Sequence, residues 1–291
     1  MNYNGIYTAL LTPFDSNNKI NEKALEQLVK HNVKLGVTGF YVGGSTAEAF
    51  LMSKDERKQI MEIVKATAPD KKLIAHIGSV NENEALELSI HAKELGYDAI
   101  SSVTPFYYKF SVEEIKGYYN RLAEGSGMPM LVYYIPALAG VSMGGNDIAS
   151  FLQDDKFIGI KFTANDFFTM EQLKTKFPNK VVFNGYDEMF LSGLAMGADG
   201  GIGSTYNFMA DKFVKIQELF AKNEIDAARE IQKEANRIIT ILIQCGVMQA
   251  EKEIMNQLGI DFGGCRKPFI DCTPEQKELL AKEVLPYITA L

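Results

Sequence analysis

The chain has 291 residues, of which 46% are hydrophobic and 23% charged, and its formal net charge is −7. These values are typical of a globular protein with a large core, built as one barrel-sized domain or as two smaller domains. The acidic balance and the dispersed basic residues argue against nucleic-acid binding, which needs clustered Lys and Arg.

Strand-like and helix-like segments alternate from the start of the chain. The strand-like segments are short apolar runs, as expected where helices cover both faces of a parallel sheet. We expect strands at 6–11, 40–42, 73–77, 99–103, 130–133, 157–161, 181–183 and 199–203. Helix starts are indicated by Asn21 and by two capping boxes, Ser53 with Glu56 and Ser111 with Glu114.

Eight strand–helix units favour a closed (β/α)8 TIM barrel over an open sheet. We expect the catalytic barrel to span residues 1–222. Residues 223–291 are helical in pattern, with a strong helix start at Thr273, Pro274 and Gln276. They are expected to form a C-terminal helical extension packed on the barrel, not a second catalytic domain.

The run FIGIKFT at 157–163 places Lys161 in an otherwise apolar strand. Burial disfavours the charged form of lysine and lowers its pKa. A neutral amine can attack a carbonyl group and form a Schiff base. The alternative is an ordinary lysine at a strand end, with its ammonium group in water.

Other candidate site residues follow the expected strands at their carboxyl ends, where barrel active sites lie. They are Ser45 and Thr46 after the second strand, Thr104 and Tyr107 after the fourth, Tyr133 at the end of the fifth, Gly185, Asp187 and Glu188 after the seventh, and Ser204 after the eighth. One barrel mouth would bring them together around Lys161.

Several of these residues have simpler explanations. Ser45 and Thr46 could be turn residues, although two hydroxyls beside a Gly-rich turn also suit a carboxylate. Tyr107 could be a packing residue or a subunit contact. Asp187 could cap the helix that follows it.

Other kinds of site have weak support. Gly200, Gly201 and Gly203 resemble a phosphate cradle, but no Lys or Arg occurs between residues 181 and 211. The chain has neither GxxxxGK nor GxGxxG, which argues against a nucleotide site. Its three His residues are scattered without an HExxH motif, which argues against a zinc site.

The cysteines and the first residues bear on the compartment. Cys245, Cys265 and Cys272 are an odd set without a CxxC motif and are interpreted as reduced thiols. No positively charged apolar leader precedes Lys19, and the longest aliphatic run, near 241–243, is short. We therefore expect a cytoplasmic protein that crosses no membrane.

These motifs resemble the N-acetylneuraminate lyase branch of the dihydrodipicolinate synthase superfamily of class I aldolases, over the whole chain. The superfamily part is GGST-x-E at 43–48, VTPFYY at 103–108 and the strands that end in Tyr133 and Lys161. The branch-specific part is YxIPALxG at 133–140, NGYDE at 184–188 and GADGGIGSTYN at 197–207. Together these motifs are highly specific, whereas GGST alone is not.

The resemblance implies a homotetramer and assigns a role to each site residue. Lys161 would form the Schiff base with pyruvate or a 2-oxo acid, and Tyr133 would transfer protons. The other implied roles are substrate-carboxylate binding for Ser45 and Thr46, a place near the reacting hydroxyl for Thr163, sugar-tail contacts for Gly185, Asp187, Glu188 and Ser204, and a contact across a subunit interface for Tyr107. No metal or organic cofactor is implied, because the lysine supplies the electron sink.

The expected reaction is the reversible cleavage of N-acetylneuraminate, a sialic acid, to N-acetylmannosamine and pyruvate. Two enzyme alternatives remain: a 2-keto-3-deoxy-sugar-acid aldolase, or another pyruvate-dependent lyase on the same scaffold. A non-catalytic sugar-acid sensor that keeps the fold and the lysine is an alternative of a different class.

Three residues depart from the superfamily patterns. Ala47 stands where the superfamily usually has Gly, and alanine would be strained there if the turn needs a positive φ. Tyr134 stands where Asn is common, and we interpret it as a neutral change behind the site. Leu138 stands where the dihydrodipicolinate synthase branch would carry an arginine for a second carboxylate, which argues against that substrate.

Overall fold

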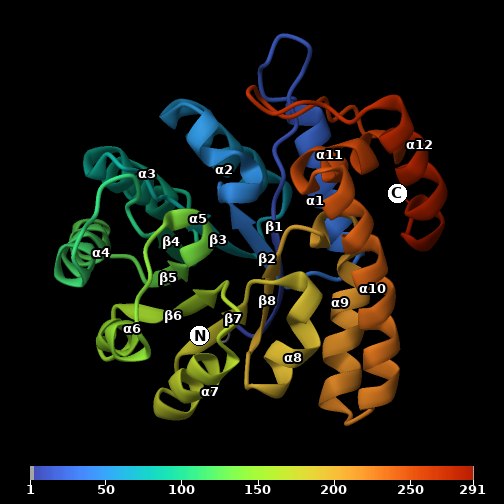
Figure 1. Cartoon of the computed structure of the whole chain (residues 1–291). Coiled ribbons are helices and arrows are strands. Elements are labelled where there is room, and N and C mark those ends of the chain that lie inside the picture. The colour runs from blue at the N-terminus through green and yellow to red at the C-terminus, as the bar shows by residue number, and fades with distance from the viewer. Residues whose placement is uncertain (1–2, 291) are drawn as a thin grey trace.

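Eight parallel strands close into a barrel within residues 3–290, the part of the chain that the computed structural model describes. Each strand pairs with the next along the chain, and β8 pairs back with β1 (Figure 1). The strands are β1 (Gly5–Ala9), β2 (Gly39–Val42), β3 (Lys72–His76), β4 (Ala99–Val103), β5 (Met130–Tyr134), β6 (Phe157–Phe162), β7 (Val181–Asn184) and β8 (Gly200–Gly203). The expected TIM barrel is confirmed.

Helices follow the strands and surround the barrel. They are α1 (Glu22–Lys34), α2 (Lys54–Thr67), α3 (Glu82–Glu94), α4 (Val112–Ser126), α5 (Pro136–Ala139), α6 (Gly145–Leu152), α7 (Phe167–Lys176), α8 (Phe190–Ala195) and α9 (Tyr206–Ala221). The Asn21 side chain accepts a hydrogen bond from the Ala24 N–H, and both capping boxes are formed, at Ser53 and at Ser111. The expected helix starts are confirmed because capping depends on residues close in sequence.

Three further helices follow the barrel: α10 (Ile225–Cys245), α11 (Val247–Gln257) and α12 (Pro274–Glu283). They lie on one side of the barrel, with α10 alongside α9 (Figure 1). A helical pattern through the whole extension was expected, and this is wrong for residues 258–273, where Gly259 and Gly263 have φ values of +94° and +68°. The boundary at residue 222 stays a prediction. None of the helices in residues 3–290 has the length and apolar composition needed to cross a membrane.

Two buried apolar layers hold the barrel together, one between strands and helices and one inside the barrel. Aromatic rings are prominent in the inner layer, including those of Tyr7, Tyr41, Tyr133 and Phe183. Side chains of a strand alternate between its two faces. On β6, Ile160 and Phe162 therefore belong to the outer layer, while Lys161 contacts rings of the inner layer.

Candidate active site

Lys161 lies near the carboxyl end of β6 and is only 5% exposed. Its Nζ atom is 4.1 Å from the centre of the Tyr133 ring and 4.5 Å from the centre of the Tyr41 ring. Burial lowers the pKa of Lys161 to about 7, although the nearby Asp187 charge acts in the opposite direction. The alternative of a lysine whose ammonium group sits in water is wrong. Near neutral pH, a large fraction of this amine is unprotonated and nucleophilic.

Tyr133 lies directly beside Lys161, because the two residues are register partners on the paired strands β5 and β6. Burial raises the pKa of Tyr133 to about 12, while the neighbouring hydroxyls of Ser45 and Thr163 act in the opposite direction. The Thr163 Oγ1 atom is buried and makes no well-aligned hydrogen bond within residues 3–290. Tyr133 therefore has a protonated hydroxyl beside two further hydroxyls, while its ring contacts the amine.

The loop after β2 carries Ser45 and Thr46 in a 3-10 turn, Ser45–Ala47, and both side chains are half-buried. Ala47 has no positive φ; the left-handed residue is the next one, Glu48, with φ of +60°. Alanine at position 47 is therefore free of the backbone strain that a positive φ would cause.

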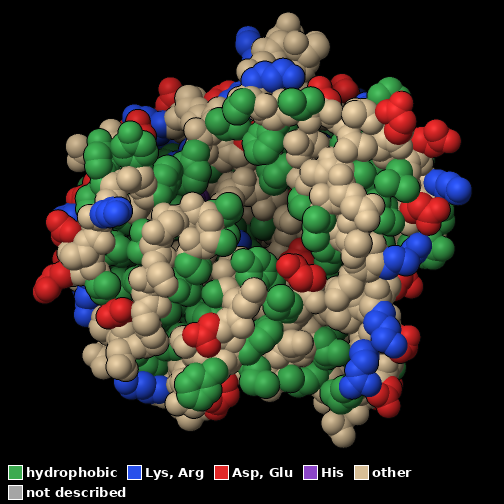
Figure 2. All heavy atoms as spheres, viewed as in Figure 1, with side chains coloured by type: hydrophobic (Ala, Val, Ile, Leu, Met, Phe, Trp, Pro, Cys, Tyr) green, Lys and Arg blue, Asp and Glu red, His purple; other side chains and the backbone are tan. Residues whose placement is uncertain are grey.

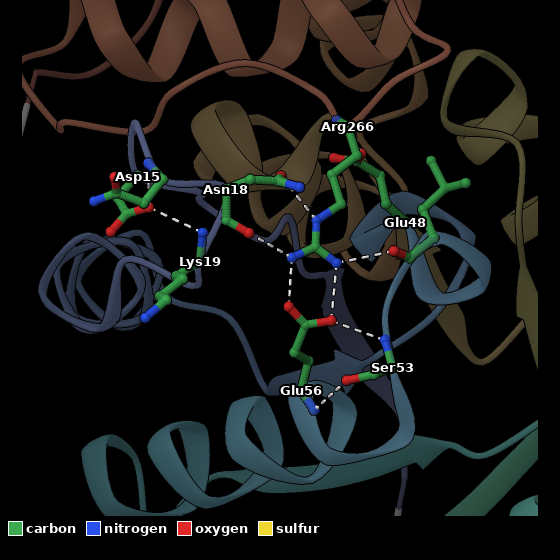
Figure 3. A network of polar contacts seen from close by, with 9 residues as sticks. Asp15, Asn18, Lys19, Glu48, Ser53, Glu56 and Arg266 are labelled. Carbon is green, nitrogen blue, oxygen red and sulfur yellow. Dashed lines mark hydrogen bonds and ion pairs between the residues drawn. The ribbon is translucent and has the colours of Figure 1, made fainter.

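Glu48 fixes this turn through a polar network that reaches the C-terminal extension (Figure 3). Its carboxylate forms an ion pair with Lys252 of α11 at 2.5 Å, and both side chains are almost completely buried. It also accepts a hydrogen bond from the backbone N–H of Arg266 at 2.7 Å. The Arg266 guanidinium in turn binds the Glu56 carboxylate on α2. Chain segments more than 200 residues apart therefore hold the Ser45–Thr46 turn.

Asp187 follows β7 and is buried. Its Oδ2 atom accepts hydrogen bonds from the backbone N–H and the hydroxyl of Thr205 at 2.9 and 2.7 Å. The alternative that Asp187 only caps its own helix is wrong, because these bonds go to the loop after β8. Burial raises the pKa of Asp187 to about 6, against the effect of the Thr205 bonds. Its Oδ1 atom has no partner within residues 3–290.

Gly185 and Glu188 belong to the same loop as Asp187. A Cβ atom on Gly185 would lie 1.9 Å from the Thr163 Oγ1 atom, so only glycine allows this close approach. Glu188 is partly exposed at the start of the segment that leads into α8. These residues and Asp187 follow the carboxyl end of β7, and their roles toward a substrate stay a prediction.

Ser204 follows β8, and its hydroxyl donates a hydrogen bond to Glu251 Oε1 at 2.6 Å. Glu251 belongs to α11 and is completely buried, and its pKa is raised to about 8 by burial and by the Asp187 charge. The sequence analysis missed Glu251 because it treated the extension as a packing layer. A signal was present: Glu251 shares a helix face with the apolar Ile254 and Met255.

His76 is a second residue that the sequence analysis did not place at the site. Its Nδ1 atom lies 2.9 Å from the Gly43 carbonyl oxygen, and its Nε2 atom accepts a hydrogen bond from the Val103 N–H. Burial lowers the pKa of His76 well below its usual value. A neutral imidazole therefore ties the loop after β2 to the end of β4, beneath the site.

Tyr107 is not brought into the mouth by its own chain. Its side chain is 86% exposed, its φ is +80°, and its ring contacts the neighbouring ring of Tyr108. Packing within the subunit is therefore not its role. The predicted contact across a subunit interface remains a prediction.

The face of the barrel seen in Figure 2 is hollowed at its centre, above the ring of strands, with an acidic side chain at the edge of the hollow. Two other hollows, of about 540 and 570 Å³, lie at the opposite end of the barrel and beside α6 and α7, and neither is lined by any site residue named above. No cluster of three or more His, Cys, Asp or Glu side chains suited to a metal ion occurs within residues 3–290.

Comparison with known proteins places this arrangement in a family. The profile of the dihydrodipicolinate synthetase family matches residues 2–285. The chain belongs to this family. Among curated relatives, the N-acetylneuraminate lyase of Clostridium perfringens is 45% identical over 282 residues, covering 96% of this chain and 98% of the relative. The N-acetylneuraminate lyase of Pasteurella multocida is 44% identical over 285 residues, covering 97% of each chain.

Solved structures give the same result. CdNal from Clostridium difficile, in complex with mannosamine, has a TM-score of 0.93 and 44% identity, with 96% of this chain and 97% of that chain covered. N-acetylneuraminate lyase from Fusobacterium nucleatum, complexed with pyruvate, has a TM-score of 0.91 and 41% identity, with 97% of each chain covered. A catalytic lysine mutant of Ruminococcus gnavus sialic acid aldolase has a TM-score of 0.93 and 30% identity, with 97% and 94% covered.

Two departures from the dihydrodipicolinate synthetase family pattern can now be interpreted. The Tyr134 hydroxyl donates to the Met143 carbonyl oxygen at 3.2 Å and so anchors the segment after β5, away from Lys161. Leu138 on α5 is 71% exposed and supplies no cation for a second substrate carboxylate. Neither departure changes the groups that surround the lysine.

Proposed function

We propose that this protein is a class I aldolase that cleaves N-acetylneuraminate reversibly to N-acetylmannosamine and pyruvate. The observation that carries the proposal is the Lys161 amine, which is buried between two tyrosine rings at the carboxyl end of β6. The names of the relatives support the substrate, because they are N-acetylneuraminate lyases at 44–45% identity over nearly the whole chain.

Lys161 is proposed to start the reaction as a nucleophile. Its neutral amine attacks the C2 ketone of the open-chain sugar acid, and uptake of one proton with loss of water gives a protonated imine. A pKa of about 7 supplies enough neutral amine at physiological pH, whereas an ordinary lysine would be almost fully protonated.

Tyr133 is proposed to carry protons during carbon–carbon cleavage. The C4 hydroxyl loses its proton, the C3–C4 bond breaks, and its electron pair moves to the iminium nitrogen to form an enamine. N-acetylmannosamine leaves, C3 of the enamine takes up a proton, and hydrolysis of the imine releases pyruvate and regenerates Lys161. Because the Tyr133 hydroxyl is protonated at rest, it acts as a relay, assisted by the substrate carboxylate.

The remaining site residues are proposed to bind different parts of the substrate. Ser45 and Thr46 hold the carboxylate with their hydroxyls and the amides of the turn. Thr163, whose hydroxyl is free of well-aligned partners in the described chain, lies near the reacting hydroxyl. The sugar tail is bound by Gly185, Asp187, Glu188 and Ser204.

The assembly, the compartment and the domain division are further parts of the proposal. We infer a cytoplasmic homotetramer in which the exposed Tyr107 reaches across a subunit interface. The barrel is assigned to residues 1–222 and the helical extension to 223–291. The buried ion pair between Glu48 and Lys252 supports close packing of the extension on the barrel.

A substrate comparison tests this function. The purified protein is given N-acetylneuraminate or an unacetylated six-carbon 2-keto-3-deoxy acid, and pyruvate release is followed. We expect the larger kcat/KM for N-acetylneuraminate. A preference for the keto-deoxy acid would favour the aldolase alternative, and the absence of turnover on both would favour a sensor.

A further inference from the structure

Glu251 lies on α11, outside the barrel, yet its side chain reaches the loop after β8. It is completely buried, and its Oε1 atom accepts the Ser204 hydroxyl at 2.6 Å. Its Oε2 atom is also buried and has no hydrogen-bond partner in the part of the chain that the structure describes. A carboxyl group placed inside a protein with one oxygen unpartnered is destabilising, so its presence requires an explanation.

The surroundings of Glu251 suggest how it behaves near neutral pH. Burial and the Asp187 charge raise the pKa of Glu251 to about 8, whereas the pKa of Asp187 is about 6. The two carboxyls are electrostatic neighbours: Asp187 follows β7, and Glu251 reaches from α11 to the loop after β8. Asp187 also has an unpartnered oxygen, Oδ1, among the described residues. Near pH 7, Asp187 is therefore the ionised member of the pair and Glu251 is largely neutral.

We infer that Glu251 is a positioning residue that holds the hydroxyl hydrogen of Ser204, so that the Ser204 oxygen accepts a hydrogen bond from a hydroxyl group of the substrate. A serine hydroxyl has one hydrogen and two lone pairs. Once the hydrogen is directed to Glu251, both lone pairs of the Ser204 oxygen are left to accept hydrogen bonds. This inference rests on the proposed function, because it names how the same site recognises the polyhydroxy tail.

Glu251 should affect binding of the sugar tail and not the chemical steps at Lys161. Without Glu251, the Ser204 hydroxyl rotates freely and competes as a donor with the substrate hydroxyl that should donate to it. Losing such a directed hydrogen bond weakens binding of the tail. Lys161 and Tyr133 are untouched, so imine formation and bond cleavage proceed as before. The C-terminal extension would thereby supply a specificity determinant and not only packing.

Two substitutions at Glu251 and one control test the inference. Glu251→Leu removes the acceptor at similar volume, and Glu251→Gln keeps a neutral acceptor oxygen. Glu253→Leu is the matched control, because Glu253 is on the same helix and pairs with Lys277 at 2.9 Å, not with Ser204. For N-acetylneuraminate, Glu251→Leu should raise KM about tenfold with kcat within about threefold of wild type. Glu251→Gln should restore KM to within about threefold, and Glu253→Leu should match wild type.

A double-mutant cycle shows whether Glu251 acts through Ser204. Adding Glu251→Leu to Ser204→Ala should change KM less than about twofold further, because the bond is already lost. Borohydride trapping of pyruvate at Lys161 should be unchanged in every variant, which reports an intact site.

The inference is overturned by an unchanged KM in Glu251→Leu, by Glu251→Gln being as impaired as Glu251→Leu, by additive effects in the cycle, or by loss of pyruvate trapping. Failure of the proposed function itself would be seen separately, as wild-type protein that does not cleave N-acetylneuraminate.

Discussion

The Lys161 amine lies 4.1 Å from the centre of the Tyr133 ring, and the two residues are register partners on adjacent barrel strands. This relationship places a buried amine with a lowered pKa next to a tyrosine whose hydroxyl is protonated. Both pKa shifts have the same first cause, because burial disfavours the charged form of each group. Imine formation requires a neutral amine, and a proton relay requires a protonated hydroxyl.

Tyr133→Phe tests the proton relay. The variant keeps the ring that contacts Lys161 and removes only the hydroxyl. We expect kcat for N-acetylneuraminate to fall by about 100-fold or more, because positioned proton transfer is typically worth about 10²–10⁴-fold. Thermal unfolding should stay near that of wild type. Activity within a few-fold of wild type would make Tyr133 a packing residue.

The pH dependence of pyruvate trapping tests the Lys161 pKa. Only the neutral amine reacts, so the trapping rate should rise with pH through about 7 and then level off. The Asp187 charge raises the Lys161 pKa, so Asp187→Asn should move the rise to lower pH while keeping an acceptor for Thr205. The exposed Asp155→Asn is the control and should leave the midpoint unchanged. A midpoint near 10 in wild type would contradict a desolvated lysine.

Gly185→Ala tests the close approach of two loops at the site. The added Cβ would lie 1.9 Å from Thr163 Oγ1, so Thr163 or the Gly185 loop must move. We expect kcat/KM for N-acetylneuraminate to fall about tenfold or more, because small displacements of positioning groups are costly. In Gly145→Ala the nearest side-chain atom is at 3.5 Å, so this control should retain wild-type activity. Equal activities in the two variants would show that the site tolerates a Cβ atom at position 185.

Lys252→Met tests the contribution of the buried ion pair to stability. The substitution leaves the Glu48 carboxylate buried without its cation, which typically costs about 3–5 kcal/mol. Urea unfolding should report a loss of that size. Lys277→Met removes a more exposed partner of Glu253 and should cost no more than about 1 kcal/mol. A loss below about 1 kcal/mol in Lys252→Met would show that Glu48 is compensated in another way.

Much of the fold was predictable because its signals are local. Apolar runs marked the strands, and the side chains at Ser53 and Ser111 marked helix starts within three residues of their partners. The segment 258–273 was not predictable from helical pattern alone, because α11 ends at Gln257 and positive φ values follow at Gly259 and Gly263.

The placement of most candidate residues at one end of the barrel was predictable, but the burial that sets their pKa values was not. Its residues follow strands that any parallel barrel brings to one mouth. The burial of Lys161 depends on rings from β2 and β5, and no pattern within β6 carries that information. Glu251 was missed for a related reason, since its partner Ser204 is 47 residues away in the chain.

Borohydride reduction in the presence of pyruvate, followed by peptide mass mapping, tests the central claim most directly. One reduced pyruvyl group should be found, on Lys161, and Lys161→Ala should abolish both the adduct and the cleavage of N-acetylneuraminate. An adduct on a different lysine, together with an active Lys161→Ala variant, would contradict the account.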